Sequence, residues 1–313
     1  MQRPASTVPT MNGRPSGGLA FGLGAYVIWG LFPLYVRALQ HVPGLELVAW
    51  RLVLAMPLCV VMVFVFRQAG EVGAALRNRR TLATLTLSAV LISTNWIIFI
   101  IAVLHGHVLA TSLGYYINPL VNVLLGTVFL SERLAPRQWA AVGLAGVAVA
   151  LLAWDALPML WISLSLGVSF AAYGLVRKLA PISAMPGLAI ETILLMPVGV
   201  GYLIYTAMAP HGLVFGQETV TTLLLSGAGV LTAVPLFLFA EAARRLDLST
   251  LGFVQFVTPT FTFLLGLFVF HEPLRPLQLG SFALIWLAIG IFTWDLIARR
   301  REPTRGTSAR PER

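Results

Sequence analysis

The residues best placed to do chemistry form two polar stripes inside apolar sequence. The first stripe consists of Tyr115, Asn118 and Asn122. Their spacing of i, i+3 and i+7 puts them on one face of a helix. The same positions 140 residues later hold Gln255, Thr258 and Thr262. All six are uncharged hydrogen-bonding groups, so each stripe offers neutral hydrogen bonds to a solute or to a neighbouring helix.

Each stripe contains a proline, and the two prolines begin matching sequences. One sequence, PLVNVLLGTVFLSERLAPRQ, starts at Pro119, and the other, PTFTFLLGLFVFHEPLRPLQ, starts at Pro259. The two align without a gap as far as a shared Trp-Asp pair, Trp154-Asp155 and Trp294-Asp295. A proline frees a backbone carbonyl, which a membrane tolerates beside a cavity or a neighbouring helix. We therefore expect the stripes to line a central binding cavity. The alternative is that they join helices, at an average of about 0.6 kcal/mol per contact.

Four further residues are candidates for the walls of this cavity. Asn95 and Trp96 lie near the middle of an apolar segment, where an amide is costly unless it faces protein or water. Trp29 in WGL and Tyr173 in YGL would supply aromatic walls. The alternative for both aromatic residues is ordinary packing or a place at the membrane interface.

Two charged residues enter the apolar segments. Arg51 lies about two turns from the predicted outer side and Glu191 about one turn from the inner side. A gate, a contact with a charged substrate and a coupling proton are the functional interpretations. Snorkelling to the nearest interface or a local ion pair is the alternative, because both residues lie near a segment end.

The elements that must position these residues are membrane helices. The chain is 58% hydrophobic and 11% charged, with a mean hydropathy of +0.86, which leaves too few charges to coat a soluble particle. Ten segments have about the 20 residues that a helix needs to cross a bilayer. They are Leu19 to Leu39, Leu45 to Phe66, Leu82 to Leu104, Val108 to Leu130, Gln138 to Trp154, Met159 to Val176, Leu188 to Met208, Val220 to Ala240, Leu248 to Phe270 and Leu277 to Ile297.

The repeat predicts how these helices are organised. Five segments separate equivalent points, and an odd number forces the second copy to cross the membrane in the opposite sense. The predicted fold is an all-α polytopic membrane protein of ten helices, built from two inverted five-helix repeats. Residues 19–155 form the first repeat and 156–297 the second. Residues 1–18 are expected to be a disordered cytoplasmic tail and 298–313 a basic cytoplasmic tail.

The net charge of +9 reflects topology rather than a nucleic-acid ligand. With both termini in the cytoplasm, 18 of the 21 basic residues fall on the inner side, and only Arg37, Arg51 and Arg275 do not. The expected location is the cell membrane, with many crossings of the bilayer.

Missing motifs exclude other classes of protein. Lys178, the only lysine, precedes Leu179, so no GK[ST] phosphate loop exists and ATP hydrolysis by that route is excluded. There is no HExxH motif, and Cys59 is the only cysteine, so no internal disulfide can form. We expect no cofactor and no metal. A membrane enzyme and a non-transporting sensor remain as alternatives to a carrier.

Several stretches resemble a known family. WGLFPLYV, NWIIFIIAV, LGYYINPLVNVLLG, FLSERL and GFVQFVTPTFTFLLGLFVFHEPL are similar to the drug/metabolite transporter superfamily, and to RarD-like members of its EamA type. The resemblance covers Leu19 to Ile297. It implies ten helices, cytoplasmic termini and a plasma-membrane carrier for small metabolites, of a kind that often exports amino acids or drugs. The second helix departs from the pattern after its arginine, in VAWRLVLAMP, which leaves the substrate open.

These observations together predict a secondary transporter that alternates access around a midplane site. The neutral and aromatic character of that site favours a zwitterionic or amphipathic solute. The direction of transport, the coupling ion and the oligomeric state, a homodimer included, are left open.

Overall fold

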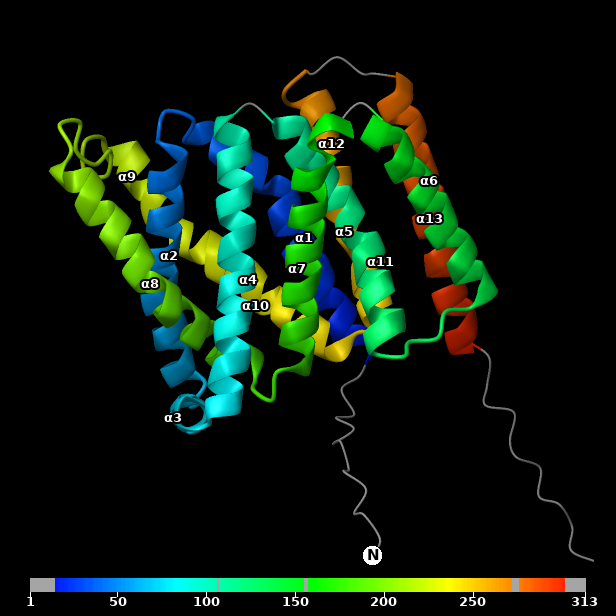
Figure 1. Cartoon of the computed structure of the whole chain (residues 1–313), viewed down its shortest axis with the longest axis horizontal. Coiled ribbons are helices and arrows are strands. Elements are labelled where there is room, and N and C mark those ends of the chain that lie inside the picture. The colour runs from blue at the N-terminus through cyan, green and yellow to red at the C-terminus, as the bar shows by residue number, and fades with distance from the viewer. Residues whose placement is uncertain (1–14, 106, 155–156, 272–275, 302–313) are drawn as a thin grey trace, which may run out of the picture.

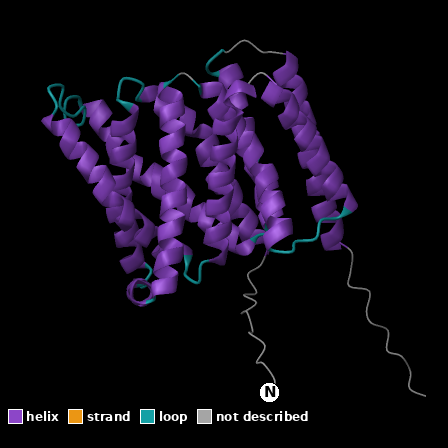
Figure 2. Cartoon of the chain, in the orientation of Figure 1, coloured by secondary structure: helices purple, strands orange, loops and turns teal. Residues whose placement is uncertain are grey.

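The computed structural model describes residues 15–105, 107–154, 157–271 and 276–301. Every element in this part of the chain is helical (Figure 2). Ten helices or helix pairs are long and apolar enough to cross a membrane, which confirms the predicted number of spans. Most of the two predicted tails (residues 1–14 and 302–313) lies outside the described residues, as do Asp155, Glu272 and Arg275. Residues 15–18 of the first predicted tail belong to α1, and residues 298–301 of the second belong to α13.

The first half contains five spans and one short helix that lies between the second and third spans. Its helices are α1 (Pro15–Ala38), α2 (Gly44–Val65), α3 (Ala69–Arg77), α4 (Arg79–Leu104), α5 (Val108–Phe129) and α6 (Pro136–Trp154). The second half contains a 3-10 turn, η1 (Leu157–Met159), followed by α7 (Leu160–Leu179), α8 (Ala184–Met208), α9 (Thr219–Ser226), α10 (Ala228–Arg245), α11 (Leu248–Gln255), α12 (Val257–Phe268) and α13 (Pro276–Arg301). Helices α9 and α10 share the eighth span, and α11 and α12 share the ninth.

The break in the ninth span lies next to its proline. Pro259 has no N–H to donate to the carbonyl of Gln255, and its ring crowds that carbonyl. Helix α11 ends at Gln255, and α12 begins at Val257. Its counterpart α5 stays a single helix through Pro119. The two proline-containing spans thus differ in local structure although their sequences match.

The 140-residue offset of the sequence recurs in the positions where helices begin. Helices α8, α9, α11 and α13 begin 140 residues after α2, α4, α5 and α6, respectively. The helix contacts also come in matching sets. Helix α5 packs on α7 as α1 packs on α11 and α12, α4 packs on α7 as α1 packs on α10, and α4 packs on α8 as α2 packs on α10. Three further contacts join a span to its own counterpart, namely α2 with α8, α5 with α11, and α6 with α13.

Figure 1 shows the arrangement of the bundle. Helices α6 and α13 form a pair at one end of the long axis, and α8 and α9 lie at the other. Helix α3 lies on one edge of the bundle, the same edge where α1 begins and α13 ends, and α9 begins on the opposite edge. We call these edges the α3 end, which is the predicted cytoplasmic side, and the α9 end. A central apolar core joins α1, α2, α7, α8 and α10, and a second core joins α5, α6, α11 and α13.

Candidate functional site

The two polar stripes meet where α5 crosses α11. Asn122 donates from Nδ2 to Asn118 Oδ1 at 3.0 Å and to Gln255 Oε1 at 3.1 Å. Asn118 donates in turn to the carbonyl of Gly167 on α7 at 2.9 Å. All three side chains are buried. The structure therefore brings these predicted residues together as a hydrogen-bonded seam between three helices.

The remaining members of the stripes lie apart from this seam. Thr258 donates to the carbonyl of Tyr26 on α1 at 2.9 Å, so it joins α12 to α1 as Asn118 joins α5 to α7. Tyr115 is 42% exposed and packs against Phe99, with 6.1 Å between ring centroids. Thr262 is exposed. The stripes thus combine bonded positions with positions that remain accessible.

Asn95 has a bonding role like that of Asn118. Its Nδ2 donates to the carbonyl of Leu166 and to Ser169 Oγ, both at 2.9 Å, and its side chain is buried. It therefore joins α4 to α7. The neighbouring Trp96 is only partly buried and faces a different set of groups.

Trp96 belongs to a cluster around Arg51. The Arg51 guanidinium lies over the Phe32 ring at 4.8 Å and over the Trp96 ring at 5.2 Å. Its Nε donates to Thr232 Oγ1 on α10 at 2.9 Å. Tyr35 and Tyr115 lie within electrostatic range of the same guanidinium. This Arg51 cluster (Phe32, Tyr35, Arg51, Trp96, Tyr115 and Thr232) gathers α1, α2, α4, α5 and α10 around one cation, in the half of the bundle nearer the α9 end.

Trp29 and Tyr173 lie in an aromatic cluster. Tyr173 stacks on Phe239 with 5.7 Å between ring centroids, and Trp29 contacts both Phe170 and Phe239 at 5.6 and 5.8 Å. Tyr26 completes this aromatic plug (Tyr26, Trp29, Phe170, Tyr173 and Phe239). Tyr26 and Tyr173 are 0% exposed, and Trp29 is partly buried. Apolar rings therefore fill the space between α1, α7 and α10.

Glu191 lies beyond the plug, toward the α3 end, and is paired. Arg177 Nη1 lies 3.3 Å from Glu191 Oε1. Ser88 and Tyr173 also donate hydrogen bonds to the Glu191 carboxylate. Glu191 is 2% exposed, so it forms a local ion pair and does not reach the interface.

Other charged groups cap helix ends at the α3 end. Glu132 accepts hydrogen bonds from the backbone N–H of Leu248 and of Ser249 at 2.6 and 2.9 Å. Lys178 donates to the carbonyls that end α10, and Arg244 donates to the carbonyls that follow α7. Burial raises the pKa of the Asp247 carboxyl above its usual 3.8, the negative charge of Glu132 raises it further, and Lys178 opposes both. Ionic contacts thus close this end of the bundle.

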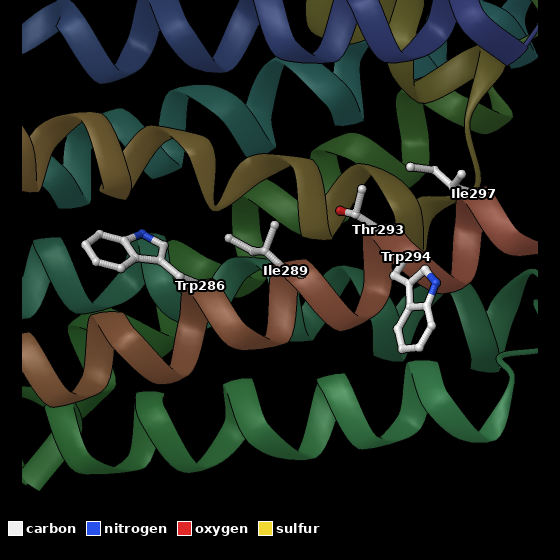
Figure 3. A pocket seen from close by; sticks show the side chains of 6 residues that line it. Trp286, Ile289, Thr293, Trp294 and Ile297 are labelled. Atoms are coloured by element: carbon white, nitrogen blue, oxygen red, sulfur yellow. The ribbon is translucent and has the colours of Figure 1, made fainter.

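A shallow groove lies away from all of these groups. Its volume is about 500 Å³, and it follows one face of α13. Figure 3 shows the side chains along this helix, and the lining consists of Trp286, Ile289, Gly290, Thr293, Trp294 and Ile297. Since α13 crosses the membrane at the edge of the bundle and Trp294 is 66% exposed, this groove faces the lipid.

Sequence reasoning missed several residues of these clusters. The charge pattern places Arg177 among the inner-side basic residues, yet its side chain is 1% exposed. Thr232 and Phe32 gave no pattern that distinguishes them from other helix residues. The 140-residue spacing offers one signal for Thr232. Its equivalent position in the first half is the apolar Ile92, so the second half has a polar side chain where the first half has none.

Comparison with known proteins identifies the family. The model of the EamA-like transporter family matches residues 16–154. The chain is 42% identical to the uncharacterized transporter PA0485 of Pseudomonas aeruginosa, over 89% of this chain and 93% of the relative. It is 41% identical to Protein RarD of Escherichia coli, over 92% and 97%. A crystal structure 17% identical in sequence shares the fold, with a TM-score of 0.69 over 91% of this chain and 99% of that one. The chain therefore belongs to the EamA-like transporter family, as a multi-pass membrane transporter related to the RarD proteins.

Proposed function

We propose that the protein is a secondary transporter that exports small zwitterionic or amphipathic metabolites or drugs by alternating access. The observation that carries this proposal is the change in exposure along the bundle axis. Tyr115, about two turns from the α9 end, is 42% exposed, whereas Tyr26 and Tyr173 in the aromatic plug are 0% exposed. We propose that the exposed ring of Tyr115 opens toward the α9 end while the packed rings of Tyr26 and Tyr173 close the other side, as one state of an alternating-access carrier requires.

The two halves supply the second state. Paired helix contacts and the 140-residue offset of the helix starts support two repeats of opposite orientation. Exchange of the two halves' conformations would open the α3 end and close the α9 end. For this end to open, α7 must separate from α8, and Arg177 from Glu191. We propose that this ion pair is the inner gate.

Of the predicted site residues, two groups have different roles in this proposal. Trp96, Tyr115 and Trp29 keep accessible surface and contact the solute. The bonded residues instead hold the helices that surround it, and they are Asn95, Asn118, Asn122, Gln255 and Thr258. Tyr173 closes the site on the side that faces the α3 end. Thr262, exposed on α12, would meet the solute on its way to the site.

The proposed orientation places both termini in the cytoplasm of a cell membrane. It is supported by the 18 of 21 basic residues that this orientation puts on the inner side. Single cysteines placed at residues 70 and 212, in a C59A background, test it with a membrane-impermeant maleimide on intact cells. Labelling of residue 70 but not residue 212 would overturn the orientation.

Counterflow in proteoliposomes tests transport itself. Vesicles loaded with a bacterial metabolite extract should take up labelled members of the same mixture in a saturable way without ATP. Asn118→Leu and Thr258→Leu should each lower this flux about tenfold while the protein still inserts, since 1.4 kcal/mol corresponds to tenfold. Thr86→Leu is the matched control, because the exposed Thr86 hydroxyl bonds only its own helix. Absence of counterflow, or a new chemical product in its place, would contradict the proposal.

A further inference from the structure

We propose that Arg51 binds a carboxylate of the transported solute, so that the substrates are monocarboxylates with an apolar or aromatic body, zwitterions included. This inference rests on the transport function proposed above and adds the chemical class of the substrate. It starts from the Arg51 cluster, where a cation lies among rings about 10 Å from the beginning of α2.

The guanidinium is held in place but not satisfied. A guanidinium has five N–H donors. The Nε donor is used by Thr232, while neither terminal amino group of Arg51 has a hydrogen-bond partner among the residues that the structure describes. The rings of Phe32 and Trp96 stabilise the positive charge but do not accept these N–H groups in the plane of the fork. The guanidinium of Arg51 is therefore held in one position, and its two terminal amino groups are available to donate hydrogen bonds to a ligand.

No carboxylate in the described part of the chain neutralises this charge. The other arginine deep in the bundle, Arg177, has Glu191 at 3.3 Å, and the more exposed Arg245 has Glu241 at 2.5 Å. A charged side chain within a membrane span is costly and normally pairs with an opposite charge or faces a water-filled space. Arg51 remains partly accessible, so an anion that enters from the α9 end can supply the missing charge.

The groups around Arg51 favour a ligand that carries a single negative charge. The planar fork of arginine fits a carboxylate or a phosphate through two parallel hydrogen bonds. A phosphate group carries a second charge near neutral pH, and the Arg51 cluster contains no second cation to match it. The aromatic rings of Trp96 and Tyr115 fit an apolar body next to the carboxylate. A monocarboxylate meets both conditions.

The test uses the full-length protein in a neutral maltoside detergent, with four matched probes. They are 3-phenylpropanoate, phenylalanine, 3-phenylpropanamide and phenylalaninamide. Thermal unfolding is followed with a thiol-reactive dye, since Cys59 is buried and is the only cysteine of the sequence. The two carboxylates should raise the melting temperature and the two amides should not. Arg51→Gln should weaken carboxylate binding roughly 10- to 100-fold, as expected for a charge-assisted pair.

Two further variants complete the design. Thr232→Val removes the hydrogen bond that orients Arg51, and it should reduce the preference for the carboxylate over the amide without abolishing binding. Arg137→Gln is the matched control, because Arg137 also lies over a tryptophan ring, at 5.6 Å from Trp294, but in the peripheral α6–α13 pair. Its binding of the probes should equal that of the wild type.

Each contrary result has its own meaning. Equal stabilisation by amides, carboxylate binding that survives in Arg51→Gln, or the absence of any carboxylate effect overturns the proposal. Stabilisation by added phosphatidylglycerol alone overturns it in favour of a lipid headgroup at Arg51. Saturable counterflow of uncharged solutes alongside any of these results leaves the transport function standing. Loss of all counterflow removes the transport function instead.

Discussion

Arg177 and Glu191 form an ion pair inside the bundle, with 3.3 Å between Nη1 and Oε1 and exposures of 1% and 2%. The pair joins α7 to α8, and the hydrogen bond from Ser88 adds α4. Arg177 also donates from Nη2 to the carbonyl of Ala184 at 2.9 Å. A protein loses far less stability when both members of a buried ion pair are replaced than when only one of them is replaced.

We therefore expect Glu191→Gln to destabilise the protein by about 3–5 kcal/mol, because it leaves the Arg177 charge uncompensated. The double variant Arg177→Met with Glu191→Gln should recover part of this loss. Thermal unfolding reported by Cys59 measures both effects.

The surface pair Arg245–Glu241 is the matched control for this measurement. It spans one helical turn at 2.5 Å, but the arginine is 39% exposed. Glu241→Gln should change stability by no more than about 1 kcal/mol. Equal losses at Glu191 and Glu241 would contradict the buried role of the Arg177 pair.

The sequence predicted the number of spans because that number depends on a property that persists along the chain. Ten apolar segments of membrane length are visible in hydropathy alone, and the 140-residue period survives in the starts of α8 and α11. The break at Phe256 was not predicted, because Pro119 has the same sequence context and α5 does not break. The two spans pack differently against α1, and a local sequence pattern does not encode this difference in packing.

The side-chain pairings were harder to predict for a related reason. The spacing placed Asn118 and Asn122 on one face, and the structure brings that face to Gln255. Which partner a polar group finds depends on how each helix is rotated about its axis, and the sequence period does not fix that rotation. The same limit hid the burial of Arg177, since a basic residue at the inner end of a span fits the positive-inside pattern equally well.

The close approach of α11 to α5 depends on Gly252. A Cβ at this position would lie 2.7 Å from the carbonyl oxygen of Pro119 and 3.0 Å from Asn122 Cβ. Gly252→Ala should therefore push the helices apart and cost about 1–3 kcal/mol, as overpacking does. Gly280→Ala on α13 is the control, because its Cβ would meet no atom within 4 Å. Equal melting temperatures for the two variants would contradict the tight crossing.

The hydrogen bond between Asn122 and Gln255 should contribute little to stability and more to transport. A double-mutant cycle with Asn122→Ala and Gln255→Ala should give a coupling energy of about 0.6 kcal/mol, and at most about 1.7, as for other bonds between membrane helices. Counterflow should fall in both single variants, because the seam fixes α5 against α11. Normal flux in both would mean that the seam serves folding alone.

Asp247, in the turn between α10 and α11, should make stability depend on pH. Because its pKa is raised above 3.8 in the folded protein, the charged carboxylate is less favourable there than in the unfolded chain. The resulting destabilisation is fully present above the folded pKa and disappears as the pH falls below 3.8.

Asp247→Asn should therefore raise the melting temperature at pH 7.5, since asparagine begins a helix as well as aspartate does and carries no charge next to Glu132. The gap between variant and wild type should narrow as the pH falls and disappear below 3.8, where the carboxyl is protonated in both the folded and the unfolded wild type. Asp247→Glu keeps the charge and should show no such gain. A gap of constant size from pH 4 to pH 7.5 would contradict the raised pKa, and a lower melting temperature at pH 7.5 would mean that attraction to Lys178 outweighs burial and the repulsion from Glu132.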